Sequence, residues 1–217
     1  MNNLVEFESR LAADQRKILL ALGCPFAIQA YLDSIPYVAE ERDRSPLAVM
    51  QDCQAHCLDG GIFAALALRR IGQRPLILDL VPEPGKDDDH VLALYRFKGA
   101  WGAIAKSNYV GLRFREPVYR SLHELVMTYF EWFNDLAREK TLRAFTRPLD
   151  LSRLDHCDWM WDEDGIRQVS RHLYRLKPIT LLTPAGVGIL SPLDDRSYLA
   201  NTQGTNFDWV YGVRPKR

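Results

Sequence analysis

The stretch from His56 to Gly72 constrains the fold of this chain more than any other. Its middle, residues 62–68, is apolar or small at every position, which predicts a helix that is buried on all sides. Two arginines near the end of the stretch and the glycine that follows them are typical of a helix C-terminus. We therefore expect a buried helix around which the other elements pack.

A cysteine, Cys57, stands at the N-terminus of this helix. The helix dipole and the unpaired backbone N–H groups at that end stabilise a thiolate, and a nucleophile is made from an otherwise inert thiol in this way. A buried structural thiol is the alternative, because most free cysteines have that role. A nucleophile for acyl transfer also needs a base, a group that orients the base, and hydrogen-bond donors for the oxyanion.

Composition limits the class of protein. The chain has 217 residues, of which 47% are hydrophobic, and its 28 basic and 28 acidic residues cancel. A neutral chain gives no electrostatic reason to expect nucleic acid or an anionic membrane as a partner. No apolar stretch approaches the roughly 20 residues that span a bilayer, and no signal peptide is evident. Four cysteines are too few for a secreted disulfide framework, so we expect reduced thiols and a cytoplasmic protein.

The flanking sequence predicts further helices and a sheet. Apolar runs between turn residues predict three strands, the last two forming a hairpin, at 75–81, 90–97 and 101–106. Helical periodicity and capping signals predict helices at 4–22, 26–32, 47–51, 121–137 and 164–176. Two further strands are expected at 179–182 and 187–190.

These elements predict an α+β fold, in which the cysteine-bearing helix packs on a small antiparallel sheet. We expect a single domain over residues 1–217, with its core at about 45–147 and a C-terminal extension at about 148–217. The extension has few apolar clusters, which argues against a second domain.

His90 is the favoured base for Cys57. It begins a strand, where an imidazole could face the N-terminus of a helix packed on the sheet. His56 adjoins the cysteine, but adjacent residues rarely face each other, so we expect it only to lend local positive charge. His123 and His172 fall on predicted helices and are interpreted as surface or satisfied histidines.

The group that orients the base is expected just after the third strand. Asn108 is the first choice and Ser107 the second, since a strand's period of 2 lets only one of them face the histidine. For the oxyanion, the backbone N–H of Cys57 is available, and Gln51 is a candidate side-chain donor, with Gln54 as its competitor.

The order of these residues resembles the transglutaminase-like superfamily, the fold group shared with papain-like cysteine peptidases and arylamine N-acetyltransferases. More narrowly, it resembles a bacterial group of transglutaminase-like proteins. The resemblance covers residues 45–110 and is carried by His56-Cys57-Leu58-Asp59-Gly60-Gly61, Asp88-Asp89-His90-Val91 and Gly99-Ala100-Trp101-Gly102-Ala103-Ile104. It implies a cysteine, a histidine, and an aspartate or asparagine on successive elements. The usual aspartate would fall near Ala105, where the chain has no acid, so Asn108 or Ser107 would replace it.

Together these features favour a cysteine-dependent acyl transferase or amide hydrolase that acts through a thioester. The substrate would be a protein, a peptide, or a small amide or thioester, and this chemistry needs no cofactor. Two other functions stay open. The missing aspartate favours a catalytically inactive binding module, and Cys53, Cys57 and Cys157 could serve a structural zinc site, although they lack the usual C-x-x-C spacing.

Overall fold

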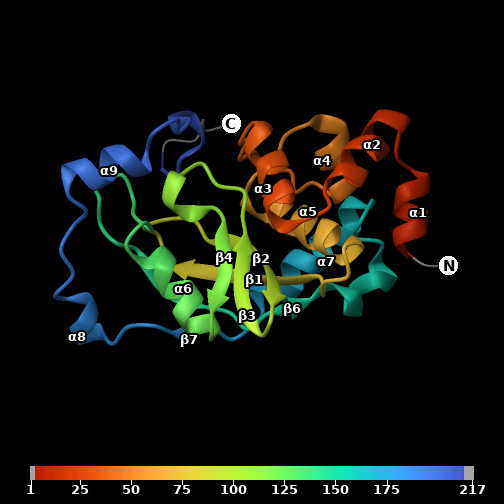
Figure 1. Cartoon of the computed structure of the whole chain (residues 1–217). Helices are drawn as coiled ribbons and strands as arrows, with labels where there is room; N and C mark the ends of the chain where they lie inside the picture. The colour runs from red at the N-terminus through yellow and green to blue at the C-terminus, as the bar shows by residue number, and fades with distance from the viewer. Residues whose placement is uncertain (1–2, 213–217) are drawn as a thin grey trace.

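The computed structural model describes residues 3–212, which form a seven-stranded sheet with helices on both faces (Figure 1). The strands, in chain order, are β1 (Leu76–Pro82), β2 (His90–Phe97), β3 (Ala100–Ile104), β4 (Arg115–Tyr119), β5 (Leu142–Phe145), β6 (Leu149–Asp150) and β7 (Ile179–Thr180). Their spatial order is β4-β3-β2-β1-β5-β7, with β6 also beside β1, and every pairing is antiparallel. The middle of the sheet is therefore β2 and β1.

The helices cover the sheet from both sides (Figure 1). In chain order they are α1 (Asn3–Ser9), α2 (Ala13–Ala21), α3 (Pro25–Ser34), α4 (Pro46–Asp52), α5 (Cys57–Arg70), α6 (Leu122–Phe130), α7 (Glu163–Tyr174), α8 (Pro184–Val187) and α9 (Asp195–Asn201). Short 3-10 helices are η1 (Val110–Leu112), η2 (Leu151–Cys157) and η3 (Phe207–Trp209). No helix among residues 3–212 is long and apolar enough to cross a membrane.

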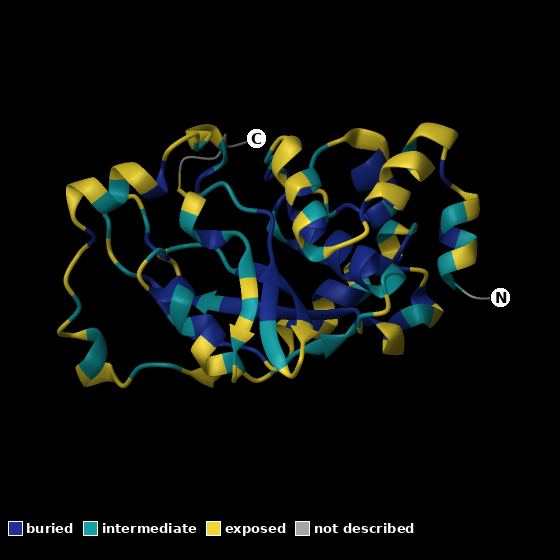
Figure 2. Ribbon diagram, viewed as in Figure 1, coloured by how far each residue is buried: buried dark blue, intermediate teal, exposed yellow. Residues whose placement is uncertain are grey.

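The alternation of side chains along β2 divides the core into two clusters. Val91 and Ala93 belong to the cluster around α5, whereas Leu92 and Leu94 belong to the cluster around α6. Because both faces of the central strands are covered, α5 and the middle of the sheet are buried (Figure 2). The C-terminal extension contributes to the first of these clusters, since fully buried Trp159 lies in it.

Two glycines let the first turn of α5 approach the sheet closely. A Cβ added at Gly60 would lie 2.2 Å from the Cβ of Lys106, and one at Gly61 would lie 2.7 Å from Cγ1 of Val91. Real Cβ atoms do not come this close to other side chains, so only glycine permits this packing. The approach fixes the position of Cys57 relative to the start of β2.

The predicted architecture is confirmed, with a cysteine-bearing buried helix packed on an antiparallel sheet. The three expected strands form β1, β2 and β3, and their hairpin turns at Lys98-Gly99. The sheet is larger than predicted because β4, β5 and β6 extend it. The strand expected at 179–182 is present as the shorter β7, which pairs with β5. Ser45 caps α4 as expected, accepting a hydrogen bond from the N–H of Ala48 at 3.2 Å.

Three boundaries differ from the prediction. The expected helix at 4–22 is two helices, because Ala12 adopts an extended conformation and its N–H donates to the Gln15 side chain. The helix expected at 121–137 ends at Phe130. The strand expected at 187–190 is absent from the described residues, because Pro184 begins the short helix α8 there and Thr183 caps it.

Candidate functional site

Cys57 is the first residue of α5 and is half-buried. Its thiol lies 3.7 Å from the main-chain oxygen of Asp89, next to the start of β2. As the first helical residue it has no intrahelical acceptor for its backbone N–H, which is therefore a candidate oxyanion donor. The residue lines a hollow of about 210 Å³ that also contains His56, Asp43 and Tyr174.

The imidazole of His56 lies beside this thiol. His56 is the N-cap residue of α5, and its Nδ1 accepts a hydrogen bond from the N–H of Leu58 at 3.2 Å. Its Nε2 lies 3.2 Å from a carboxylate oxygen of Asp59 and 3.4 Å from one of Asp43. Asp59 also accepts a hydrogen bond from the backbone N–H of His56, which completes a capping box. The ring is thus held from both sides.

These neighbours set the charge of the His56 ring. Burial disfavours the cation, but the hydrogen bonds to Asp43 and Cys57 and the charge of Asp59 outweigh it and raise the pKa of His56 to about 10. The N–H of Leu58 acts in the opposite sense, because it donates to Nδ1 and favours a neutral ring with its proton on Nε2. In either state the Nε2 proton faces the two carboxylates.

A buried arginine anchors the carboxylates. Arg44 is only 1% exposed, its backbone N–H donates to Asp59 at 2.7 Å, and its Nε donates to Asp52 at 3.0 Å. Its guanidinium also pairs with Glu40. Burial raises the pKa of Asp59 to about 6, although the nearby His56 and the two backbone N–H donors act against this shift. The arginine network therefore fixes the side chain that positions the imidazole.

The structure places His90 on the other face of the sheet. Val91 packs on α5, so the alternation of the strand directs the His90 side chain toward the second cluster. Nε2 of His90 lies 2.7 Å from the main-chain oxygen of Leu112, and the ring meets Phe133 edge-on. Burial lowers the pKa of His90 to about 4. The predicted pair of Cys57 and His90 is not formed in this arrangement.

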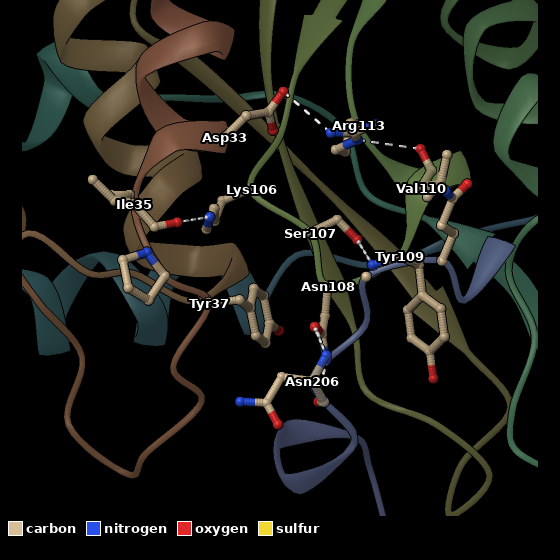
Figure 3. A pocket seen from close by; sticks show the side chains of 13 residues that line it. Asp33, Ile35, Tyr37, Lys106, Ser107, Asn108, Tyr109, Val110, Arg113 and Asn206 are labelled. Atoms are coloured by element: carbon tan, nitrogen blue, oxygen red, sulfur yellow. Dashed lines mark hydrogen bonds and ion pairs between the residues drawn. The ribbon is translucent and has the colours of Figure 1, made fainter.

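The other predicted members of the site lie apart from the thiol. The amide of Asn108 exchanges two hydrogen bonds with the main chain of Asn206, and the hydroxyl of Ser107 accepts the N–H of Tyr109 (Figure 3). Neither residue bonds to His90, whose ring is oriented by the Leu112 carbonyl instead. Gln51 is exposed on α4 and does not line the hollow at Cys57.

A larger hollow of about 430 Å³ lies beside Ser107 and Asn108 (Figure 3). Lys106 lines it, and its Nζ donates to the main-chain oxygens of Leu32 and Ile35 at the end of α3. Burial lowers the pKa of Lys106 to about 8. A cation at the C-terminus of a helix stabilises that helix, so the contacts of this lysine are accounted for structurally. Tyr37 borders both this hollow and the one at Cys57.

Two carboxyl groups lie behind the thiol, on the face of the sheet that carries α5. Asp79 of β1 is opposite Val91, and Asp89 precedes β2 by one residue. Burial and the nearby Asp89 carboxyl raise the pKa of Asp79, and burial raises that of Asp89 although the Tyr174 hydroxyl opposes the shift. The sequence assigned neither acid a role, although Asp89 is part of the motif that precedes the predicted base His90.

Metal ligation fits the thiols poorly. Cys53, Cys57 and Cys157 each contact a different main-chain oxygen, and the ligand group of three or more acidic, histidine or cysteine side chains found within residues 3–212 contains no cysteine. The alternative of a zinc site on these thiols is therefore wrong for this arrangement. The group that is found, Asp43 with His56 and Asp59, spans at most 4.8 Å.

That group of ligand atoms is already engaged. Asp59 accepts two backbone N–H groups and lies 3.7 Å from the Arg44 guanidinium, whose charge repels a metal ion. Asp43 accepts the hydroxyl of Ser170 at 3.1 Å. The contacts of Asp43, His56 and Asp59 are thus those of a charge network around the imidazole.

Sequence reasoning missed most of this network. Asp59, three residues after His56, is a capping-box signal that is visible in the sequence. A capping box makes His56 the N-cap residue, and the side chain of an N-cap residue turns back over the first turn of the helix. Arg44 and Asp43 had no such signal, because loop residues before α4 reach the site only through the fold.

No family model matches this chain, and neither does any curated protein. Solved structures with some similarity include LapG from Legionella pneumophila, which is 11% identical with a TM-score of 0.38, over 51% of this chain and 73% of LapG. A second is EGTA-treated LapG from the same organism, which is 10% identical with a TM-score of 0.42, over 76% of this chain and 95% of LapG. TM-scores below 0.5 at this identity assign neither a family nor an activity.

Proposed function

We propose that the chain is a cysteine-dependent acyl transferase or amide hydrolase that acts through a thioester on Cys57. The observation that carries the proposal is the pairing of a thiol at the N-terminus of a buried helix with a fixed imidazole, at the edge of a hollow. A positive pole and a cationic neighbour both stabilise negative charge on sulfur. The sequence resemblance to the transglutaminase-like superfamily implies the same chemistry.

The reaction would proceed in two steps. The thiolate of Cys57, whose proton has already passed to the neighbouring imidazole, attacks the carbonyl carbon of an amide, ester or thioester, and the backbone N–H of Cys57 donates a hydrogen bond to the oxyanion. The bond to the leaving group breaks, and the imidazolium returns the proton to that group. Water or an amine then attacks the thioester, breaks the carbon–sulfur bond and restores the thiol.

The imidazole in contact with the thiol is His56, and we assign it the proton transfer. Asp43 and Asp59 would hold it as Asp or Asn does in known triads. His90 remains the second candidate for this role, with Asn108 or Ser107 as its partner, and Gln51 remains a candidate oxyanion donor. That arrangement requires the His90 ring to leave the Leu112 carbonyl and the Asn108 amide to leave Asn206.

A panel of activated esters, thioesters and peptide amides tests the proposal. We expect turnover by the wild type, none by Cys57→Ser, and a covalent acyl adduct on Cys57 in a mass spectrum of the quenched enzyme. His56→Gln should lower kcat at least a hundredfold, as loss of a general base does, whereas His90→Gln should leave kcat within a few-fold. If His90→Gln lowers kcat at least a hundredfold and His56→Gln does not, His90 is the general base.

The inactive binding module is the second candidate. It is favoured by the occupation of both nitrogens of His56, by Leu58 on one side and the carboxylates on the other. Absence of turnover and of any acyl adduct across the panel would favour the binding module over the enzyme.

A further inference from the structure

The hollow of about 430 Å³ beside Ser107 and Asn108 lies between the C-terminal end of α3 and the segment that follows β3 (Figure 3). Its volume falls in the range of small-molecule sites. The aromatic side chains of Tyr37 and Tyr109 line it, together with polar groups of these two segments and of the residues before η3. A hollow with aromatic walls and a few convergent polar groups is the usual form of a ligand site.

Lys106 brings a buried positive charge to this hollow. It is 4% exposed, and its Nζ donates to the main-chain oxygens of Leu32, at 2.6 Å, and Ile35. These neutral acceptors take two of the three N–H donors of an ammonium group, and the dipole of α3 offsets only part of its charge. Lysine is rarely buried without an ion-pair partner, yet the ion pairs of lysine in the described part of the chain involve Lys86 and Lys140 and not this side chain. The helix end thus holds the ammonium group without supplying an anion for it.

The neighbouring charged groups do not balance this charge. Arg113 lines the same hollow, and its Nη1 lies 3.3 Å from Oδ2 of Asp33. Asp33 is the one carboxylate among the lining residues, so a single acid faces the two cations Lys106 and Arg113. The pKa of Lys106 reflects these surroundings, since burial lowers it, Asp33 raises it and Arg113 lowers it. The hollow therefore holds one more positive than negative charge.

A single excess positive charge fits a ligand group with one negative charge. A carboxylate can accept from an ammonium and a guanidinium group at once, through its two oxygens. A phosphate monoester carries about −1.5 to −2 at neutral pH, and its second charge would meet Asp87 and Asp88, which line an adjoining hollow. That hollow shares Ser107, Asn108 and Tyr109 with this one. The balance of charge thus favours a carboxylate.

We propose that this hollow is a binding site for an organic carboxylate. Lys106 and Arg113 donate hydrogen bonds to the carboxylate, and the body of the ligand packs on Tyr37 and Tyr109. A free carboxylic acid and the acidic side chain of a peptide both present this chemistry. The site meets the thiol hollow at Tyr37, which lines both, but its ligand binding does not depend on chemistry at Cys57.

Calorimetric titration with phenylacetate at pH 7 tests the proposal, with phenylacetamide as a probe of equal shape and no charge. We expect phenylacetate to bind the wild type at least tenfold more tightly than phenylacetamide. Lys106→Met should weaken phenylacetate binding at least tenfold, because it removes the charge and keeps an unbranched side chain. Lys17→Met, at an exposed position on α2, is the matched control and should bind like the wild type. Tighter binding of Nα-acetyl-glutamate amide than of phenylacetate would indicate a peptide ligand, and weaker binding a free acid.

Three further variants keep the result interpretable, because Lys106→Met leaves two carbonyl groups without their donor and so destabilises the fold. Arg113→Gln changes a side chain that is 39% exposed and should weaken phenylacetate binding at least threefold. Val110→Trp, at an exposed position in the lining, should abolish binding by filling the hollow while both cations remain. Cys57→Ser should bind phenylacetate like the wild type, which separates this site from the proposed acyl chemistry. Absence of phenylacetate binding to the wild type, equal binding of phenylacetamide, or unchanged binding to Val110→Trp or to a folded Lys106→Met protein would overturn the inference.

Discussion

The contact between the first turn of α5 and the sheet is the feature that positions the thiol, and Gly60→Ala tests it directly. The new Cβ would lie 2.2 Å from the Cβ of Lys106 and 3.1 Å from its Cγ. The Cβ of Lys106 is bonded to the main chain of the segment that follows β3, so it cannot rotate away as the tip of a long side chain could. The helix must therefore move away from the sheet.

The magnitude follows from two opposing effects. Alanine in place of glycine within a helix stabilises by about 1 kcal/mol, and overpacking of a well-packed contact costs about 1–3 kcal/mol. Because the overlap here involves an atom fixed to the backbone, we expect the upper part of that range and a net loss of about 2 kcal/mol. For a chain of this size the loss lowers Tm by roughly 4–8 °C.

Urea and thermal unfolding measure this change. Gly23→Ala is the matched control, since nothing lies within 4 Å of the added Cβ and the residue is not in the left-handed region; we expect its stability to equal or slightly exceed that of the wild type. Gly61→Ala should resemble Gly60→Ala, because its Cβ meets Val91 at 2.7 Å. A Gly60→Ala protein as stable as the wild type would refute the close packing of α5.

Three further predictions concern the charged and titrating groups. Burial lowers the pKa of His90 from 6.5 to about 4, so between these pH values the unfolded chain binds a proton that the folded chain does not. The free energy of unfolding should therefore fall by up to about 3 kcal/mol as the pH drops from 6.5 to 4. His90→Gln should remove this loss when urea unfolding is measured across that pH range. The raised pKa of Asp79 has the opposite sign, so stability should fall as pH rises above about 4, and Asp79→Asn should flatten that slope. Arg44→Met should lower the free energy of unfolding by about 3–5 kcal/mol, because it leaves Asp52 and Asp59 without their buried cation. Arg42, which also pairs with Asp52, is exposed, so Arg42→Met should lower the free energy of unfolding by less than about 1 kcal/mol.

The elements with strong periodicity were predictable from the sequence. The buried helix and the strands of the hairpin carry their signal in consecutive residues, since a helix apolar on all faces and a short run of apolar residues between turns each have few alternatives. The short strands β6 and β7 have two residues each; β6 is too short for a pattern, and β7 is only the first half of the strand expected at 179–182. They exist because the edge of β1 and β5 offers them partners.

The site was only partly predictable, because the sequence does not show on which face of β2 the side chain of His90 lies. Sequence order places His90 near the N-terminus of α5, but the side on which its ring emerges depends on which neighbour packs on the helix. Val91 occupies that position against Gly61, and strand alternation then sends His90 to the opposite face. His56 was set aside because adjacent residues rarely face each other on a helix, yet His56 is the N-cap and not a helical residue. Its extended backbone turns the ring back over the first turn.

The rates at which the four cysteines are alkylated test directly whether Cys57 is an activated nucleophile. Limiting iodoacetamide is added to the native protein at pH 7, and each thiol is quantified by peptide mapping. Cys24 and Cys53 are exposed, Cys57 is half-buried and Cys157 is buried, so accessibility alone predicts that Cys24 and Cys53 react first. If the helix N-terminus and His56 activate the thiol, Cys57 reacts at least tenfold faster than either of them, and His56→Gln abolishes this advantage. Faster labelling of Cys24 and Cys53 than of Cys57 would contradict it.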